Sequence, residues 1–287
     1  MPTSATSGAR SPSGKPPSGK HCAVLGSPIA HSLSPVVHRA AYGELGLDWT
    51  YEAVDVDEDG LEAFLGSLTD DWRGLSLTMP LKRVALDLVE RSSAVATAVG
   101  SVNTILLGPD EGRGSGDNTD VPGVQAALRE HRLDEPGSVR IVGGGATAAS
   151  IAYALAALGL TDLEIVVRDA SRADVAAQVA RRAGADVVVQ SLDHPLLEKV
   201  DLLVSTVPGD AIGSRSHELA ESSRAVLDVS YDPWPTPLAT AAEQAGLPVV
   251  TGLDLLAHQA ALQVELMTGS TIDPDLLRRA ALAALTT

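Results

Sequence analysis

Hydrophobic and polar positions alternate along the chain with two different periods. Short apolar runs of strand length, such as His21–Gly26 and Leu202–Ser205, are followed by segments in which apolar residues recur every three or four positions. Strands that alternate with helices are typical of parallel sheets covered by helices, so the pattern predicts an α/β protein.

A first series of elements precedes residue 120, and the pattern then restarts. Two such series predict two domains with a ligand-binding cleft between them. In the first series we expect strands at His21–Gly26, Trp49–Val54, Arg73–Thr78, Val102–Leu107 and Gly114–Asn118, with helices at Pro35–Leu45, Leu61–Leu68 and Leu81–Glu90. In the second we expect strands at Val139–Val142, Leu163–Val167, Ala185–Val189, Leu202–Ser205, Ala225–Val229 and Leu247–Val250, with helices at Val121–Arg132, Thr147–Leu158, Arg172–Ala183, Ser216–Ser222, Pro237–Ala245, Leu253–Thr268 and Pro274–Leu285.

Composition narrows the class of protein. Residues 1–20 are rich in Ser, Pro and Gly and have no apolar core of a signal peptide, so we expect a disordered tail. The apolar runs are interrupted well before the roughly 20 residues that a membrane span needs. Cys22 is the single cysteine, which excludes an intrachain disulfide or a cysteine zinc cluster and favours a cytoplasmic location.

The charge balance argues for a small-molecule partner. The chain has 37 acidic and 21 basic side chains, for a net charge of −16. Such a surface disfavours nucleic acid, whose binding depends on Lys and Arg neutralising phosphates, and it disfavours anionic membranes. An anionic ligand must therefore be held by local donors.

A glycine-rich loop follows the first strand of the second series. Gly143, Gly145 and Ala146 have the G-x-G-x-x-A spacing of a dinucleotide-binding loop, and Thr147 begins the next helix. Such a loop brings a pyrophosphate to a helix N-terminus, although Gly-rich turns also occur for packing reasons alone.

The end of the following strand bears on the choice of cofactor. Arg168 and Arg172 suit the 2′-phosphate of NADP, whereas Asp169 suits the free ribose hydroxyl of NAD. A helix-starting Asp beside two surface arginines is the structural alternative. The residues favour NADP and leave NAD open.

Lys82 is the candidate acid–base residue. Pro80 suits the first position of a helix and Met79 its cap, which would place Lys82 in the first turn. The positive end of the helix dipole disfavours an ammonium charge there, as suits a lysine that exchanges protons. A solvated surface lysine is the alternative for this residue taken alone.

Several polar residues at element ends have both a structural and a functional interpretation. Ser34 before Pro35 is typical of a helix N-cap, and Asp120 before a helix is equally compatible with a cap. Ser32 has no such structural explanation, so it is a candidate for binding a carboxylate together with Ser34. Gln259 by itself is an unremarkable helix amide.

Seven segments, in this order between about Cys22 and Gly269, resemble the shikimate dehydrogenase family. Chance does not account for seven such matches in one order. The segments are Gly26–Pro35, Leu77–Lys82, Val102–Thr104, Asn118–Asp120, the loop at Gly143, Tyr231–Leu238 and Gly252–Ala260.

The resemblance implies a reversible reduction of 3-dehydroshikimate to shikimate with NADPH. It implies a substrate domain of residues 21–119 plus 253–287 and a Rossmann NADP domain of residues 120–252, with the active site between them. Lys82 and Asp120 match the catalytic pair. The expected substrate-binding residues are Ser32, Ser34, Thr78, Asn103, Tyr231 and Gln259, and Gly252 joins Gly143, Gly145, Ala146, Thr147, Arg168 and Arg172 as an expected cofactor-binding residue.

Alternatives to this function differ in cofactor, substrate or activity. They are an NAD-dependent quinate or quinate/shikimate dehydrogenase, an aminoshikimate-pathway homologue, and a nucleotide-binding protein without activity. Ala146, Asp210 and Leu255 depart from the family pattern on the cofactor side. The seven histidines lack zinc-binding spacing, so we expect no metal. Monomer and homodimer are both compatible with the sequence.

Overall fold

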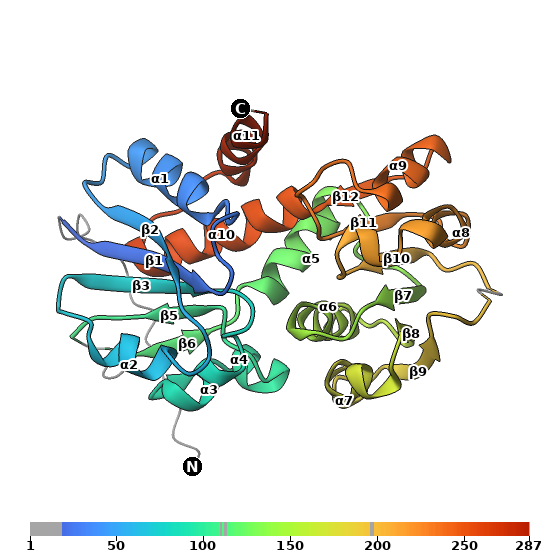
Figure 1. Cartoon of the computed structure of the whole chain (residues 1–287), viewed down its shortest axis with the longest axis horizontal. Helices are drawn as coiled ribbons and strands as arrows, with labels where there is room; N and C mark the ends of the chain where they lie inside the picture. Colours follow the sequence, from blue (N-terminus) through green and yellow to red (C-terminus); the bar gives the residue numbers. More distant parts are fainter. Residues whose placement is uncertain (1–18, 110, 112–113, 196–197, 287) are drawn as a thin grey trace, which may run out of the picture.

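Two six-stranded sheets, each covered by helices, make up the part of the chain that the structure describes (Figure 1). The structure is a computed structural model that describes residues 19–109, 111, 114–195 and 198–286. The predicted tail therefore lies outside the described residues except for Gly19 and Lys20. The Gly19 amide donates to the Asp48 carboxylate at 3.0 Å, and Lys20 Nζ donates to the Asp70 carbonyl at 2.7 Å.

The first sheet has the strand order β2-β1-β3-β5-β6-β4. It departs from a fully parallel arrangement at β5, which runs antiparallel to both β3 and β6. The β5–β6 connection is a short reversal of the kind that needs no crossover helix. The strands are β1 His21–Gly26, β2 Thr50–Asp55, β3 Trp72–Leu77, β4 Arg91–Ser92, β5 Thr104–Leu106 and β6 Ser115–Asp117.

Alternation along β1 explains why helices lie on both faces of this sheet. Cys22 and Val24 belong to one apolar cluster, whereas Ala23 and Leu25 belong to another on the opposite face. The first cluster is completed by α1 Ser34–Glu44, α10 Gly252–Thr268 and α11 Pro274–Leu285, and the second by α2 Leu61–Gly66, α3 Val84–Leu88 and α4 Ala94–Val99.

The second sheet is entirely parallel, with the order β9-β8-β7-β10-β11-β12. This is the 3-2-1-4-5-6 order of a dinucleotide-binding Rossmann fold, and it places a crevice at the carboxyl ends of β7 and β10, where the chain direction across the sheet reverses. The strands are β7 Ser138–Val142, β8 Asp162–Val167, β9 Asp186–Ser191, β10 Leu202–Ser205, β11 Val226–Asp228 and β12 Val249–Thr251.

Helices again cover both faces of the second sheet. The apolar cluster on one face includes residues of α5 Asp120–Glu130, α6 Ala146–Ala157 and α7 Asp174–Arg182. The cluster on the other face includes α8 Ser216–Glu221 and α9 Pro237–Gln244. Three short 3₁₀ helices occupy Ala170–Ala173, Gly209–Ala211 and Gly213–Arg215.

Helices α5 and α10 connect the two sheets (Figure 1). Helix α5 follows the first sheet and packs on α6 of the second, while α10 follows β12 and returns to pack on α1, α11, β3 and β5. The two helices also pack on each other. As a result, a cleft between the sheets is lined by residues that lie more than 100 positions apart in the sequence.

The helix predicted at Leu81–Glu90 is the clearest correction to the expected elements. Helix α3 begins at Val84, so Lys82 lies in the turn before the helix rather than in its first turn. The Lys82 carbonyl accepts a hydrogen bond from the Val102 amide at 2.7 Å, and this distant partner keeps the backbone out of the helical pattern. The proposed effect of the helix dipole on Lys82 therefore does not apply.

Most other boundaries agree with expectation within a few residues. Helix α4 Ala94–Val99 was not expected; the Ser93 hydroxyl caps it by accepting from the Ala96 amide at 3.1 Å. None of the described helices is long and apolar enough to cross a membrane.

Candidate active site

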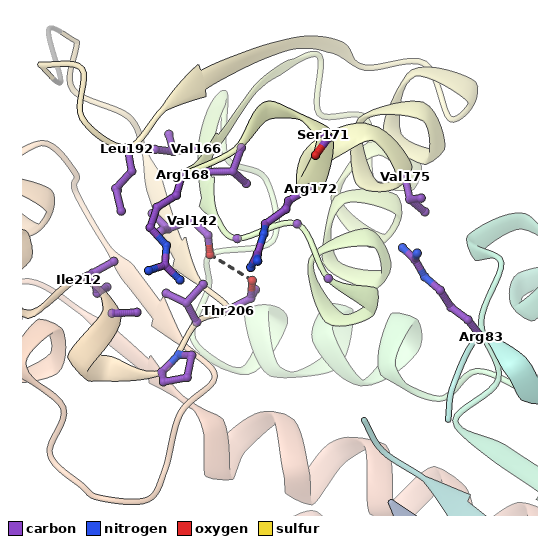
Figure 2. Close-up of a pocket in the computed structure, with 17 residues that line it drawn as sticks. Arg83, Val142, Val166, Arg168, Ser171, Arg172, Val175, Leu192, Thr206 and Ile212 are labelled. Atoms are coloured by element: carbon purple, nitrogen blue, oxygen red, sulfur yellow. Dashed lines mark hydrogen bonds between the residues drawn. The ribbon is translucent and has the colours of Figure 1, made fainter. Parts of the chain in front are cut away.

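Two cavities lie along the cleft. The smaller, of about 220 Å³, is lined by strands of the first sheet and by helices and a loop that border the second, and we call it the substrate hollow. The larger, of about 420 Å³, lies against the glycine loop and the ends of β7, β8 and β10, and we call it the cofactor cavity. Figure 2 shows the residues around the cofactor cavity.

Lys82 and Asp120 form an ion pair in the wall of the substrate hollow. Lys82 Nζ lies 2.6 Å from Asp120 Oδ2, and the two side chains are 13% and 8% exposed. A pair this short and this buried holds the amine in one position at the surface of the hollow, where it can exchange a proton with a ligand.

Asp120 is held from its other side. Asn103 Nδ2 donates to Asp120 Oδ1 at 2.8 Å, so both carboxylate oxygens have a donor. Asp120 is the first residue of α5, where the helix N-terminus favours a negative charge. It does not cap the helix, because Asn118 Oδ1 accepts from the amides of Asp120 and Val121 at 3.1 and 3.3 Å.

Asn103 lies behind the pair and does not line the hollow. Its second amide hydrogen bond goes to Thr119 Oγ1 at 2.9 Å. Its Oδ1 accepts from the Thr119 amide and from Thr104 Oγ1, each at 2.8 Å. The amide is thus fully used in holding Asp120 and the loop before α5.

The other predicted substrate residues come together around the hollow. Ser32, Ser34, Thr78, Tyr231 and Gln259 all line it. Ser34 is the first residue of α1 and not its N-cap, and its amide donates to Ser32 Oγ at 3.3 Å. Burial raises the pKa of Tyr231, and a hydrogen bond to the Leu33 backbone opposes that rise.

Two polar residues that line the hollow, Ser76 and Gln263, were not among those expected from the sequence. Both carried a signal, because Ser76 is two positions before Thr78 on the same face of a strand and Gln263 is one helical turn after Gln259. Ser76 Oγ lies 2.9 Å from Gln263 Oε1, and Tyr51 Oη lies 2.6 Å from Ser76 Oγ.

The proton directions in this network follow from one carbonyl. Gln263 Nε2 donates to the Asn103 carbonyl at 3.2 Å, which can only accept, so Gln263 Oε1 is the acceptor for its other partners. Ser76 therefore donates to Gln263, and Tyr51 donates to Ser76. One lone pair of the Ser76 hydroxyl oxygen is left for a ligand hydroxyl.

His38 completes the network. Its Nε2 lies 3.2 Å from Gln263 Oε1, so this nitrogen carries the proton and donates. Its ring stacks on Tyr51 at 4.1 Å between centroids. Burial lowers the pKa of His38 to about 4, and the bond to Gln263 opposes that effect. His38 is therefore neutral near neutral pH.

The glycine loop fits a pyrophosphate. Gly143 has φ +116° and permits the turn, while a Cβ at Gly144 would lie 2.0 Å from the Arg172 carbonyl oxygen. At Gly145, the N-cap of α6, no atom lies within 4 Å of the position of a Cβ, so a ligand can approach the backbone there. Gly143, Gly144 and Gly145 all line the cofactor cavity.

The arginines at the end of β8 point toward this cavity (Figure 2). Arg168 and Arg172 both line it, and Asp169 does not. Asp169 Oδ1 instead accepts from the amide and hydroxyl of Ser171 at 3.0 and 2.9 Å, which lowers its pKa and caps the following 3₁₀ helix. This arrangement favours a 2′-phosphate over a free ribose hydroxyl.

Three expected cofactor residues lie elsewhere. Thr147 and Gly252 line the substrate hollow, and Ala146 lines neither cavity. A Cβ at Gly252 would lie 2.2 Å from the Val229 carbonyl oxygen, so this glycine is needed for close packing. Because Gly145 lines the cofactor cavity and Thr147 the hollow, the N-terminus of α6 lies between the two cavities.

Arg83 is a further residue that sequence reasoning missed, and it lines the cofactor cavity from the opposite side of the cleft. Among the described residues, no group of three or more His, Cys, Asp or Glu side chains is arranged to hold a metal ion.

Comparison with known protein families identifies two matching segments. Residues 24–105 match the shikimate dehydrogenase substrate binding domain, and residues 252–282 match the shikimate 5′-dehydrogenase C-terminal domain. The chain is 35% identical over 267 residues to shikimate dehydrogenase (NADP(+)) of Thermus thermophilus, and the alignment covers 92% of this chain and 98% of that protein.

Solved structures agree with this similarity. Mycobacterium tuberculosis shikimate dehydrogenase has a TM-score of 0.83 and 38% identity, covering 92% of this chain and 99% of its own. The Thermus thermophilus enzyme in complex with NADP(H) and shikimate has a TM-score of 0.80 and 34% identity, covering 93% of this chain and all of its own (100%).

Proposed function

The chain belongs to the shikimate dehydrogenase family, and from that premise we propose that it reduces 3-dehydroshikimate reversibly to shikimate with NADPH. This reaction is a step toward aromatic amino acids. The structural observation that carries the proposal is the Lys82–Asp120 ion pair, which lies at 2.6 Å in the wall of a polar hollow. The hollow adjoins a glycine loop whose neighbouring arginines suit NADP.

The proposed chemistry divides between cofactor and protein. When bound, NADPH supplies the hydride. Lys82 donates a proton to the ketone oxygen as negative charge develops there, and it accepts that proton in the reverse direction. Asp120 fixes the position of the amine, and Asn103 fixes the carboxylate through its bond to Oδ1.

The hydroxyl and amide groups of the hollow suit a polyhydroxylated acid, because each can pair with a ring hydroxyl or a carboxylate oxygen. We assign the substrate carboxylate to Ser32 and Ser34, and the ring and its hydroxyls to Thr78, Tyr231 and Gln259. Asn103 acts in this proposal through Asp120 and not by direct contact. A site of this kind rejects an analogue that lacks a hydroxyl, because its own buried groups are left unpaired.

The remaining parts of the proposal concern domains and cofactor. Residues 21–119 with 253–287 form the substrate domain, and residues 120–252 form the NADP domain. Gly143 and Gly145 bind the pyrophosphate, and Arg168 with Arg172 binds the 2′-phosphate. Ala146 and Thr147 contribute the N-terminus of α6. NADP in the names of the relatives and the capping role of Asp169 do not favour an NAD-dependent quinate enzyme.

We also propose a cytoplasmic location, which the single buried cysteine supports. Burial raises the pKa of Cys22 to about 11, so it remains a thiol at neutral pH. The oligomeric state is a monomer or a homodimer, and light scattering after size exclusion distinguishes the two.

Initial rates at 340 nm test the function, with shikimate or quinate as substrate and NADP⁺ or NAD⁺ as cofactor. We expect efficient oxidation of shikimate with NADP⁺ and little turnover with the other combinations. A preference for quinate with NAD⁺ would instead assign the chain to quinate oxidation. Binding of NADP⁺ without turnover of either substrate would indicate a protein that has lost activity.

A further inference from the structure

Arg83 occupies an unusual place in the cofactor cavity. Among the described residues that line this cavity, all but Arg83 lie between Val142 and Ile212, in the part of the chain that forms the second sheet. Arg83 comes from the turn between β3 and α3 of the first sheet. Figure 2 shows its guanidinium group pointing across the cleft toward the Rossmann elements.

The side chain has no structural role that would account for this position. Arg83 is exposed, and its guanidinium group forms no ion pair or side-chain hydrogen bond with the described residues. It is the N-cap residue of α3 but makes no side-chain capping bond. A cation at a helix N-terminus is not favoured electrostatically, so local structure gives no reason for an arginine here.

The ligand expected in the cofactor cavity explains why an arginine lies at this position. Arg83 lines the same cavity as Arg168, Arg172 and the glycine loop, in a chain whose net charge is −16. Several guanidinium groups around one cavity of an acidic protein are suited to a ligand with more than one phosphate, because each group can form two parallel hydrogen bonds to phosphate oxygens.

We propose that Arg83 is a phosphate-binding residue that reaches the dinucleotide from the substrate domain. The inference rests on the proposed function and extends it, since it adds a cofactor contact from the opposite side of the cleft. Arg83 directly follows Lys82, whose carbonyl is bonded to Val102. A phosphate held by Arg83 therefore also restrains the turn that carries the catalytic lysine.

Isothermal titration calorimetry with NADP⁺ and with NAD⁺ tests this role without reliance on turnover. Arg83→Ala should weaken NADP⁺ binding by about tenfold, the range expected for a hydrogen-bonded charge pair. The affinity of Arg83→Lys for NADP⁺ should lie between those of the wild type and Arg83→Ala, because lysine keeps the charge and loses the planar guanidinium group. Arg279→Ala removes an exposed arginine that lines neither cavity and should bind NADP⁺ as the wild type does.

The two ligands separate the possible contacts. If Arg83→Ala loses affinity for NADP⁺ alone, Arg83 binds the 2′-phosphate. If it loses affinity equally for NADP⁺ and NAD⁺, Arg83 binds the pyrophosphate. Either result supports the proposal. Affinity for both ligands within twofold of the wild type in Arg83→Ala would overturn it and leave the proposed function intact. Failure of the wild type itself to bind NADP⁺ would overturn both. The melting temperature of Arg83→Ala should equal that of Arg279→Ala.

Discussion

The substrate hollow and the cofactor cavity differ in how their polar side chains are held. In the hollow, polar side chains such as Asp120, Ser76 and Gln263 are buried and already hydrogen-bonded to other side chains of the protein. In the cofactor cavity, Arg83 and Arg168 are exposed and form no ion pair with the described residues. The hollow is therefore preorganised, whereas the cavity arginines are left to be ordered by the ligand.

This difference has an energetic consequence. A buried polar group must be paired, because leaving it unsatisfied costs about 1–3 kcal/mol. Side chains around the hollow therefore contribute to folding as well as to binding. Exposed arginines carry no such cost, so their replacement should change affinity and leave stability alone. Substitutions on the two sides of the cleft test this separation of affinity from stability.

Lys82→Ala should lower kcat by about 10²-fold or more with a modest change in KM, since it removes the group that exchanges the proton with the substrate. Steady-state rates of shikimate oxidation measure this. The control is Lys199→Ala, which removes an exposed lysine that lines neither cavity. Near-wild-type turnover in Lys82→Ala would remove this lysine from the chemistry.

His38 should make the hollow side of the molecule sensitive to acid. Its pKa is 6.5 when unfolded and about 4 when folded, so the unfolded state binds more protons between these values. The contribution of neutral His38 to the free energy of unfolding is complete above pH 6.5. It is lost as the pH falls toward 4, by about 3 kcal/mol in total.

Urea unfolding at about pH 7 and pH 4 measures this loss. His38→Gln, which cannot titrate, should lose about 3 kcal/mol less than the wild type between these values. His217→Gln, on the exposed side of α8, should follow the wild type. An equal loss in His38→Gln and wild type would show that His38 does not titrate as its burial implies.

Gln263 and Gln259 form a matched pair on one helix. Gln263→Leu should lower the free energy of unfolding by about 2 kcal/mol or more, since it leaves His38, Ser76 and Thr104 without their partner. The Gln259 side chain makes one hydrogen bond to the described residues, to the Leu256 carbonyl of its own helix, so Gln259→Leu should raise the KM for shikimate with little loss of stability. Equal stability losses in the two variants would contradict the proposed network.

Arg168→Ala should give the smallest effect and should separate affinity from stability most clearly. We expect the KM for NADP⁺ to rise about tenfold, the KM for NAD⁺ to stay unchanged and the urea midpoint to stay that of the wild type. Arg182→Ala, on the exposed surface of α7, is the control. A lower urea midpoint in Arg168→Ala would show that the two cavities do not differ as described.

The spacing of hydrophobic residues predicted most of the helices and strands, because this spacing and the turn residues between elements depend on neighbouring positions in the sequence. It did not predict that β5 runs antiparallel, since strand direction depends on which neighbour a strand pairs with. It also extended the helix at Leu81–Glu90 too far toward Lys82. The bond between the Lys82 carbonyl and Val102 joins segments 20 residues apart and leaves no local trace.

The candidate site shows the same limit at the level of single side chains. The sequence offered Asp120 and Ser34 as possible caps, but each is the first residue of its helix, and its amide donates to a side chain two residues earlier, that of Asn118 or Ser32. Ser76 and Gln263 carried a periodicity signal and were detectable. Arg83 carried no such signal, because no neighbouring residue in the sequence indicates that the residue after Lys82 faces the other domain.

The return of α10 to the first sheet also sets an order of events during synthesis. Gly252, Gln259 and Gln263, which line the hollow, belong to α10, which leaves the ribosome only after the strands of the second sheet. Until then, the apolar side of α1 that packs on α10 and α11 has no cover. The strands of the second sheet can therefore pair first, while the first sheet keeps an exposed hydrophobic face until α10 and α11 have been made.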